Sequence, residues 1–175
     1  MIQAEPYCVQ LGAKILREHA IAVDDIHAAD IRQTIDRMEK IMIETQGVGI
    51  AAPQVNVSKR IIIVASHPTR RYPYAPFMAS TAMLNPAFQA LSDVKEKSWE
   101  GCLSIPSIRA LVPRYQSIVA QYTDLQGVFR ELELNGFVAR IFQHECDHLD
   151  GKVYLDRVED NADIISEHEY YKLIA

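Results

Sequence analysis

The 175-residue sequence contains only three cysteines, Cys8, Cys102 and Cys146. A small, odd set of cysteines does not build a disulfide framework. Residues 1–5 also lack the basic start and apolar stretch of a signal peptide. In such a chain free thiols are expected, and they remain available as metal ligands or nucleophiles.

Long apolar runs and excess positive charge are absent as well. No apolar run approaches the roughly 20 residues of a membrane-spanning helix. The chain has 18 Lys and Arg against 23 Asp and Glu, a formal net charge of −5. A nucleic-acid-binding protein usually carries a basic surface. We therefore expect a cytoplasmic protein with neither a membrane nor a nucleic acid as partner.

Glycine (7 residues) and proline (8 residues) are too few for a low-complexity chain, and 49% of the residues are hydrophobic. This is the composition of an ordinary globular protein that can bury a sizeable core. No repeat or linker divides the sequence. We expect a single domain over residues 1–175.

What the sequence does contain is the motif H-E-x-x-H in residues 143–149 (QHECDHL). On a helix, His144 and His148 are four residues apart and project from one face, so both can bind one metal ion. Glu145 lies beside them and can act on a water molecule without being a ligand. Two such histidines also occur on solvated faces or in cores, so the motif alone leaves the metal site a hypothesis.

Other segments have clear secondary-structure signals. Apolar residues recur at helical spacing over residues 25–45, which predicts a long amphipathic helix with methionines in its core-facing stripe. Strands are expected at 59–66, 82–84, 88–91, 117–123, 128–134 and 153–155, with a hairpin turn at 124–127. Short helices are expected within 11–20 and 160–175, an irregular loop at 47–54 and a solvated loop at 67–77.

A catalytic metal site of this type needs a third protein ligand. The residues alone leave several candidates open: the three cysteines, the four remaining histidines and many carboxylates. Cys102 stands out because it follows a glycine in a short segment that can expose backbone N–H groups. Cys146 lies between the two histidine positions and is expected to point away from the metal.

Three segments together resemble the signature motifs of the peptide deformylases. They are residues 47–54 (GVGIAAPQ), 100–104 (EGCLS) and 143–149 (QHECDHL), in the same order and spacing as in the family. The resemblance covers most of the chain, from about residue 11 to residue 156. It implies an α+β fold in which antiparallel strands pack around a central metal-binding helix.

The resemblance also implies an activity. Members remove the N-formyl group from the N-terminal formyl-methionine of newly synthesised polypeptides and release formate. Cys102, His144 and His148 are the implied ligands of one divalent ion, with water in the fourth position. Fe²⁺ is the usual ion of the family, and Zn²⁺, Ni²⁺ or Co²⁺ can occupy the site.

Roles follow by resemblance for the remaining motif residues. Glu145 is the implied general base and then acid. The side-chain amide of Gln54 and the backbone N–H of Leu103 are the implied donors to the oxyanion.

The substrate and supporting positions are less specific. A peptide can pair with an exposed strand edge, and Gly49 lets its backbone approach closely. Gly101 and Arg109 are further substrate-side candidates, although Arg109 is alternatively a solvated side chain. Val48, Phe137, Ile141 and the aliphatic part of Arg140 are candidates for the methionine pocket, with ordinary core packing as the alternative. Glu100 and Arg114 are expected to pair and hold the Cys102 loop, and Asp147 to support a ligand.

Two other functions stay open at this point. An H-E-x-x-H metallopeptidase is one, although it would give Cys102 and Gln54 no role. A non-catalytic family member that binds peptides or nascent chains is the other. The tail after residue 160 is short and acidic, whereas many bacterial members end in a longer basic helix. If that helix helps members to dock on the ribosome, the possible transient ribosome contact of this chain is in doubt.

Overall fold

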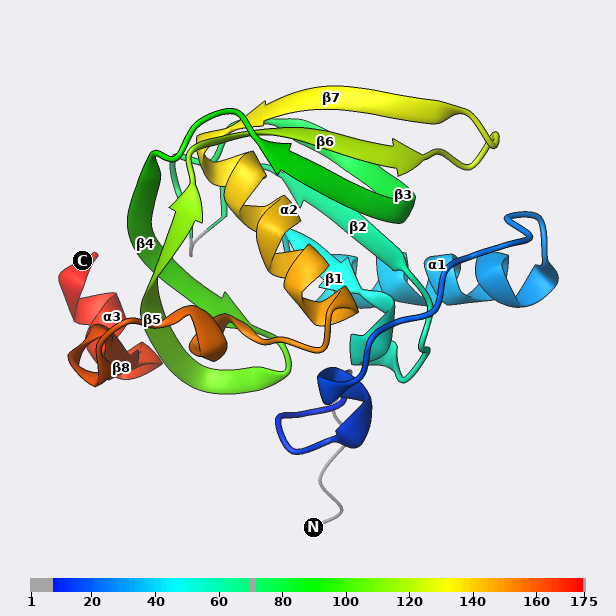
Figure 1. The fold of residues 1–175 in the computed structure, drawn as a ribbon. Coiled ribbons are helices and arrows are strands. Elements are labelled where there is room, and N and C mark those ends of the chain that lie inside the picture. Colours follow the sequence, from blue (N-terminus) through cyan, green and yellow to red (C-terminus); the bar gives the residue numbers. More distant parts are fainter. Residues whose placement is uncertain (1–7, 70–71, 175) are drawn as a thin grey trace, which may run out of the picture.

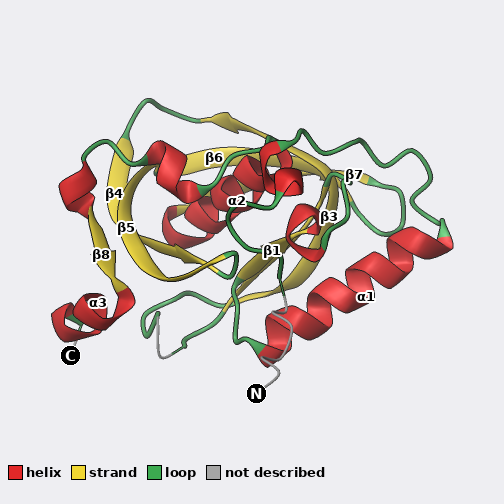
Figure 2. Cartoon of the chain, turned by 90° about the horizontal axis from the view of Figure 1, so that it is seen from below, coloured by secondary structure: helices red, strands yellow, loops and turns green. Residues whose placement is uncertain are grey.

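A computed structural model describes residues 8–69 and 72–174. Its central element is helix α2 (Gly136–Leu149), in which every residue from Val138 to Leu149 is buried. Strands surround this helix (Figures 1 and 2). The predicted α+β class, with antiparallel strands around the H-E-x-x-H helix, is confirmed.

The strands form two antiparallel sheets. The five-stranded sheet has the order β1-β2-β3-β6-β7 and the three-stranded sheet the order β4-β5-β8. The first contains β1 (Gly49–Ala51), β2 (Ile61–Ser66), β3 (Met78–Ala90), β6 (Ser117–Thr123) and β7 (Phe129–Asn135). The second contains β4 (Lys95–Cys102), β5 (Ile105–Tyr115) and β8 (Ile164–Ser166).

Strand β2 is buried along its whole length, which explains its uninterrupted apolar sequence. Ile61 and Ile63 belong to the core cluster that also contains the apolar stripe of α1 (Ala29–Glu44). Ile62 and Val64 belong to the cluster formed with α2. Because side chains alternate between the two faces of a strand, a strand between two helices needs apolar residues at every position.

Helix α1 and the β6–β7 hairpin agree with their predictions. The stripe of α1 is buried, so its methionines pack in the core as expected. Strand β6 has the predicted bounds, and β7 begins and ends one residue later than predicted. In the turn, Asp124 Oδ1 accepts hydrogen bonds from the backbone N–H groups of Gln126 and Val128, and Gly127 has a φ of 79°.

Several short elements were predicted incorrectly. Residues 47–54 are not an irregular loop, because Gly49–Ala51 pairs with β2 as strand β1 and Ala52–Val55 forms a 3₁₀ helix. Residues 153–155 do not form a strand but lead into the 3₁₀ helix Tyr154–Arg157. The expected helix within residues 11–20 is only the 3₁₀ turn Lys14–Arg17. Strands β4 and β5 were not predicted.

The two short strands expected around Pro86 are one strand, β3. It continues through an irregularity between Leu84 and Ala87, where Asn85 has a φ of 50°. The Asn85 amide holds the bend, because it accepts from the Val23 N–H at 2.8 Å and donates to the Val23 carbonyl at 2.9 Å. A distant contact thus overrides the local break that a proline causes.

The C-terminal segment is β8 followed by the short helix α3 (Glu167–Leu173). Ile164 packs against a core cluster of Ile105, Ala110, Val112, Val153 and Tyr154, whereas Leu173 is largely exposed. Ala175 lies outside the described residues. Among the residues described, no helix is long and apolar enough to cross a membrane.

The position of β2 generates a stability prediction. Ile63→Ala removes a side chain with 0% exposure from the core, and we expect it to lower the free energy of unfolding by about 2–5 kcal/mol. The matched control is Ile43→Ala on α1, where the side chain is 74% exposed and a change within about 0.5 kcal/mol is expected. Urea unfolding measures both. Equal effects would contradict the two-sided burial of β2.

Candidate metal centre

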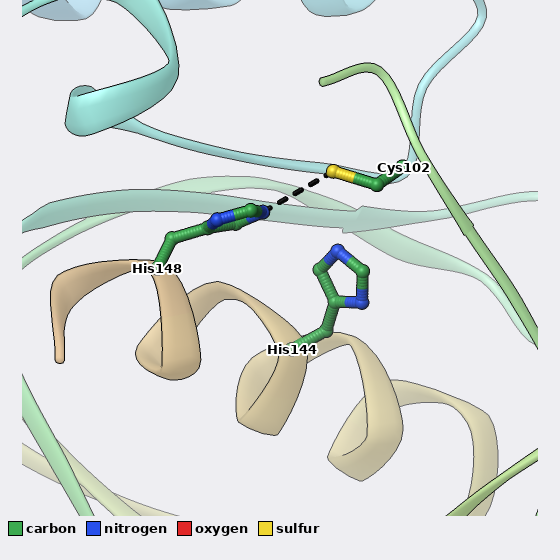
Figure 3. A group of neighbouring side chains, drawn as sticks. All are labelled: Cys102, His144 and His148. Carbon is green, nitrogen blue, oxygen red and sulfur yellow. Dashed lines mark hydrogen bonds between the residues drawn. The ribbon is translucent and has the colours of Figure 1, made fainter. Parts of the chain in front are cut away.

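The two histidines of α2 and one cysteine from β4 converge at one point (Figure 3). His144 and His148 lie one helical turn apart, with ring centroids separated by 5.2 Å. Cys102 ends β4, and its Sγ lies 3.3 Å from Nε2 of His148. One donor atom from each of the three residues lies within 4.8 Å of the other two. These are the three predicted ligands.

The protonation of this cluster suits a cation. Burial raises the pKa of the Cys102 thiol, but the neighbouring His148 and His144 outweigh it and hold that pKa well below its usual range. Burial lowers the pKa of His144, but Cys102 and Glu100 outweigh it and raise that pKa well above its usual range. The site thus stabilises a thiolate beside a positive charge. A divalent ion between the same donors would replace that proton, so the residues fit a metal.

Glu100 orients the His144 ring. Its Oε2 lies 2.8 Å from His144 Nδ1, which leaves Nε2 of that ring for the cluster. Arg114 donates to both oxygens of Glu100, at 2.9 and 3.0 Å, and Arg140 donates to Oε1 at 2.9 Å. Burial raises the pKa of Glu100, but Arg114 and His144 outweigh it and lower that pKa overall. The expected pairing of Glu100 with Arg114 is present.

Arg114 also links the three-stranded sheet to α2. Its Nη1 donates to Asp147 Oδ2 at 2.5 Å, and Arg157 donates to the same carboxylate at 2.6 Å. Asp147 therefore contacts no ligand directly but holds Arg114, which holds Glu100. A ligating histidine commonly depends on such a carboxylate for its orientation.

Glu145 lies beside the cluster as a buried carboxyl group with 4% exposure. Burial raises the pKa of Glu145 to about 7, although the charges of His144 and His148 lower it. Its Oε2 is buried and has no hydrogen-bond partner among the described residues. The group is therefore available to a reactant rather than committed to the protein.

Gly49 makes this approach of β1 to α2 possible. A Cβ at Gly49 would lie 2.3 Å from Glu145 Oε1 and 2.7 Å from Ile141 Cγ2. No side chain fits there without moving the carboxylate. The reason for glycine is close packing, because its φ is not in the left-handed region.

Gln54 points its amide at the cluster. Its Oε1 accepts from the backbone N–H of Ala51 at 2.9 Å, which orients the NH₂ group. Nε2 then lies 3.3 Å from Cys102 Sγ and 3.2 Å from Ser104 Oγ. Leu103 follows Cys102 in the turn between β4 and β5, so both predicted oxyanion donors belong to residues next to Cys102.

One pocket opens onto these residues. It is lined by Glu145, Gln54, Leu103, Cys102 and His144, and by the predicted substrate residues Val48, Gly49, Gly101, Phe137 and Ile141. Tyr72 and Trp99 also line it and were missed. Tyr72 belongs to the segment predicted to be a solvated loop, whose residues 70 and 71 lie outside the described part of the chain. No periodicity in that segment indicated a pocket residue.

Two expectations about single residues are resolved by burial. Arg109 is not solvated, since it is 3% exposed, and it lines a second, adjoining pocket with Gly101, Cys102 and Leu103 rather than the pocket around Glu145. Its guanidinium contacts Gly101 instead, where an added Cβ would lie 2.2 Å from Nη1. Cys146 packs in the α2 core cluster, as expected for a residue that points away from the metal.

Comparison with known proteins identifies the family. A sequence model described as polypeptide deformylase matches residues 7–163. The chain belongs to the polypeptide deformylase family. It is 51% identical over 166 residues to peptide deformylase 2 of a Nostoc species, covering 95% of this chain and 93% of the relative. It is 42% identical over 152 residues to peptide deformylase 1 of Bordetella pertussis, covering 87% of this chain and 86% of that relative.

Solved deformylase structures agree with the fold. A Met-Ala-Ser-bound class I type b peptide deformylase from Acinetobacter baumannii superposes with a TM-score of 0.81 at 41% identity, covering 86% of this chain and 96% of that one. The Ehrlichia chaffeensis peptide deformylase superposes with a TM-score of 0.79 at 32% identity, covering 89% of each chain. The deformylase resemblance read from the three motifs is confirmed, and the chain is an enzyme of this hydrolase family rather than an H-E-x-x-H metallopeptidase.

The ligand set generates the first prediction for the site. Cys102→Ala removes the thiolate, and we expect metal content after dialysis to fall at least about tenfold. Cys146→Ala is the matched control, because that thiol lies in the apolar core. Metal per chain is measured by elemental analysis. Full occupancy in Cys102→Ala would remove Cys102 from the ligand set.

The close contact at Gly49 generates the second prediction for the site. Gly49→Ala should displace the Glu145 carboxylate and lower kcat about 100-fold with metal content unchanged. Gly47→Ala is the control, because its Cβ would meet nothing closer than Thr45 Oγ1 at 3.3 Å. Steady-state kinetics on both variants compare the two positions. Equal losses of activity would show that glycine is needed for some other reason.

Proposed function

We propose that this deformylase hydrolyses the N-formyl group of formyl-methionyl peptides with Glu145 as the group that carries the proton. The observation that supports this is the position and pKa of Glu145. The carboxyl group is buried beside the three-ligand cluster, opens onto the pocket and has a pKa raised to about 7. A group whose pKa lies near the working pH can both accept and return a proton.

The proton transfer has two parts. As carboxylate, Glu145 takes a proton from the attacking water. As carboxylic acid, it gives that proton to the amine that leaves as the new N-terminus, while the formyl group leaves as formate. The second step regenerates the carboxylate, so one residue serves the whole cycle.

Gln54 and Leu103 are the proposed donors to the oxyanion that forms on the formyl carbonyl. The amide of Gln54 is already oriented by its hydrogen bond from Ala51, so little reorganisation is needed. Donors fixed in this way before reaction are worth about 2.7–4 kcal/mol each in other hydrolases.

We propose that Cys102, His144 and His148 hold one divalent ion. When bound, such an ion polarises the carbonyl and lowers the pKa of water. Fe²⁺ is the proposed resident ion, with Zn²⁺, Ni²⁺ or Co²⁺ able to take its place. A thiolate with two imidazoles is a donor set that each of these ions accepts.

The proposed peptide site is the edge of β1. Within residues 8–69 and 72–174, this strand is the first in its sheet and pairs only with β2, so its other edge can receive an extended peptide. Val48, Phe137 and Ile141 would contact the methionine side chain, with Gly49 and Gly101 next to the backbone. The related Acinetobacter structure with bound Met-Ala-Ser supports a peptide ligand of this kind.

Formylated nascent chains are the substrates of this family, and we propose that the enzyme meets them in the cytoplasm during protein biosynthesis. We propose neither a membrane nor a nucleic-acid partner, given the net charge of −5. We treat residues 1–175 as one catalytic domain, since elements of both sheets contact α2.

The test is release of formate from formyl-Met-Ala-Ser by anaerobically purified protein with measured metal content. We expect activity that a chelator abolishes and ferrous iron restores. Glu145→Gln should keep the metal and lower kcat about 10²–10⁴-fold. Unchanged turnover in this variant would refute the proton role of Glu145. A metal-replete wild type that releases no formate would instead favour a non-catalytic peptide binder.

A further inference from the structure

Arg109 connects two segments that the proposed mechanism does not use. Its Nη2 forms an ion pair of 2.5 Å with Glu167 Oε1 at the start of α3. Its Nη1 donates to the hydroxyl oxygen of Tyr72 at 3.3 Å. One buried guanidinium therefore joins the C-terminal segment to the segment that precedes β3.

Tyr72 is the end of this chain of contacts that reaches the substrate pocket. It lines the pocket, and its ring packs against Phe137 with centroids 4.8 Å apart and planes inclined by 51°. Phe137 is one of the proposed contacts of the methionine side chain. The hydroxyl of Tyr72 accepts the hydrogen bond from Arg109, so this bond and the contact with Phe137 both hold the ring.

The position of Arg109 is tightly defined. The guanidinium occupies the space over Gly101, where a Cβ would lie 2.2 Å from Nη1 and 2.5 Å from Cζ. On another side it lies over the Tyr170 ring, with Cζ 5.3 Å from the centroid. With 3% exposure it has little access to water. Because the Arg109 side chain is confined in this way, a displacement of its partner Glu167 also affects its other partner, Tyr72.

Glu167 supplies the charge that this burial requires. A buried cation without a counter-ion is strongly disfavoured, and among the described residues Glu167 is the carboxylate paired with Arg109. Glu167 lines the adjoining pocket beside Gly101, Cys102 and Leu103, and not the pocket around Glu145. It also lies beyond residues 7–163, the part that matches the family model. The contact is therefore made by the C-terminal segment, outside the three motifs.

We propose that Glu167 is a positioning residue for the substrate pocket. Through Arg109 it holds Tyr72 against Phe137, and Tyr72 thereby forms a wall that contacts the first side chain of the peptide. The inference rests on the proposed formyl-methionyl substrate. It assigns the acidic C-terminal segment a role in substrate selection, because Tyr72 packs against Phe137, a proposed contact of the methionine side chain.

The test compares variants at both ends of the contact. Tyr72→Phe keeps the ring and removes the acceptor for Arg109, and Glu167→Ala removes the counter-ion. For each we expect the KM of formyl-Met-Ala-Ser to rise about fivefold to tenfold with kcat within about twofold. The KM of formyl-Ala-Ala-Ser should change by less than about twofold. Glu169→Ala is the matched control, since Glu169 pairs with Lys172 in solvent and should change neither KM.

Coupling between the variants distinguishes positioning from general stability. The double variant Tyr72→Phe/Glu167→Ala should raise KM no more than either single variant, because both break the same chain of contacts. Glu167→Gln keeps an acceptor for Arg109 and should have a smaller effect than Glu167→Ala. Additive effects, or equal losses for both peptides, would overturn the proposal. If Glu167→Ala fails to fold, Glu167→Gln takes its place, alone and in the double variant with Tyr72→Phe.

Hydrogen exchange gives a readout that needs no activity. The Tyr72 amide donates to the Thr69 carbonyl, and the Ala75 amide to the Tyr72 carbonyl. Both amides should exchange at least about tenfold faster in Glu167→Ala than in wild type or Glu169→Ala. Unchanged exchange would refute the link through Arg109. A wild type that releases no formate would refute the proposed function, while this exchange result would still test the link.

Discussion

The pairing of the buried Glu100 carboxylate is the interaction on which the site depends. Glu100 lies two residues before Cys102. Its carboxylate binds the His144 ring and accepts hydrogen bonds from Arg114 and Arg140. Removal of one partner from such a buried pair leaves an uncompensated charge and costs about 3–5 kcal/mol. The same contacts therefore hold β4 against α2 and orient the His144 ring. Stability and ligand geometry cannot be separated at this residue.

Close approach of backbones is the second requirement, and glycine meets it twice. Gly49 lets β1 lie against Glu145, and Gly101 leaves room for the Arg109 guanidinium beside Cys102. Each position requires glycine because an added Cβ would clash with a neighbouring side chain. In both cases the neighbour is a charged group whose position matters to the pocket, so packing and chemistry impose the same restriction on the sequence.

Local regularities made α1, the β6–β7 hairpin and the α2 ligands predictable. Each is encoded within a few residues, as apolar spacing, an Asp-x-x-Gly turn or histidines four apart. Strand β3 was divided in prediction because Pro86 looks like a break, whereas Asn85 bonds to Val23, 62 residues away. Strands β4 and β5 were missed because they carry the charged site residues. They pair with one another, but their sequences lack the apolar–polar alternation that predicts a strand. Cys102 could be assigned as ligand only with the help of the family motifs.

The residues around Arg109 show where this limit matters for function. Arg109 lies outside the three motifs, Glu167 follows it by 58 positions, and Tyr72 precedes it by 37. No periodicity relates these positions, so only the folded chain brings them together. The motifs specify the reaction through short-range chemistry, while the wall of the pocket is assembled from long-range contacts. Two deformylases with the same motifs can therefore share a mechanism and still differ in how firmly they hold the first side chain of the peptide.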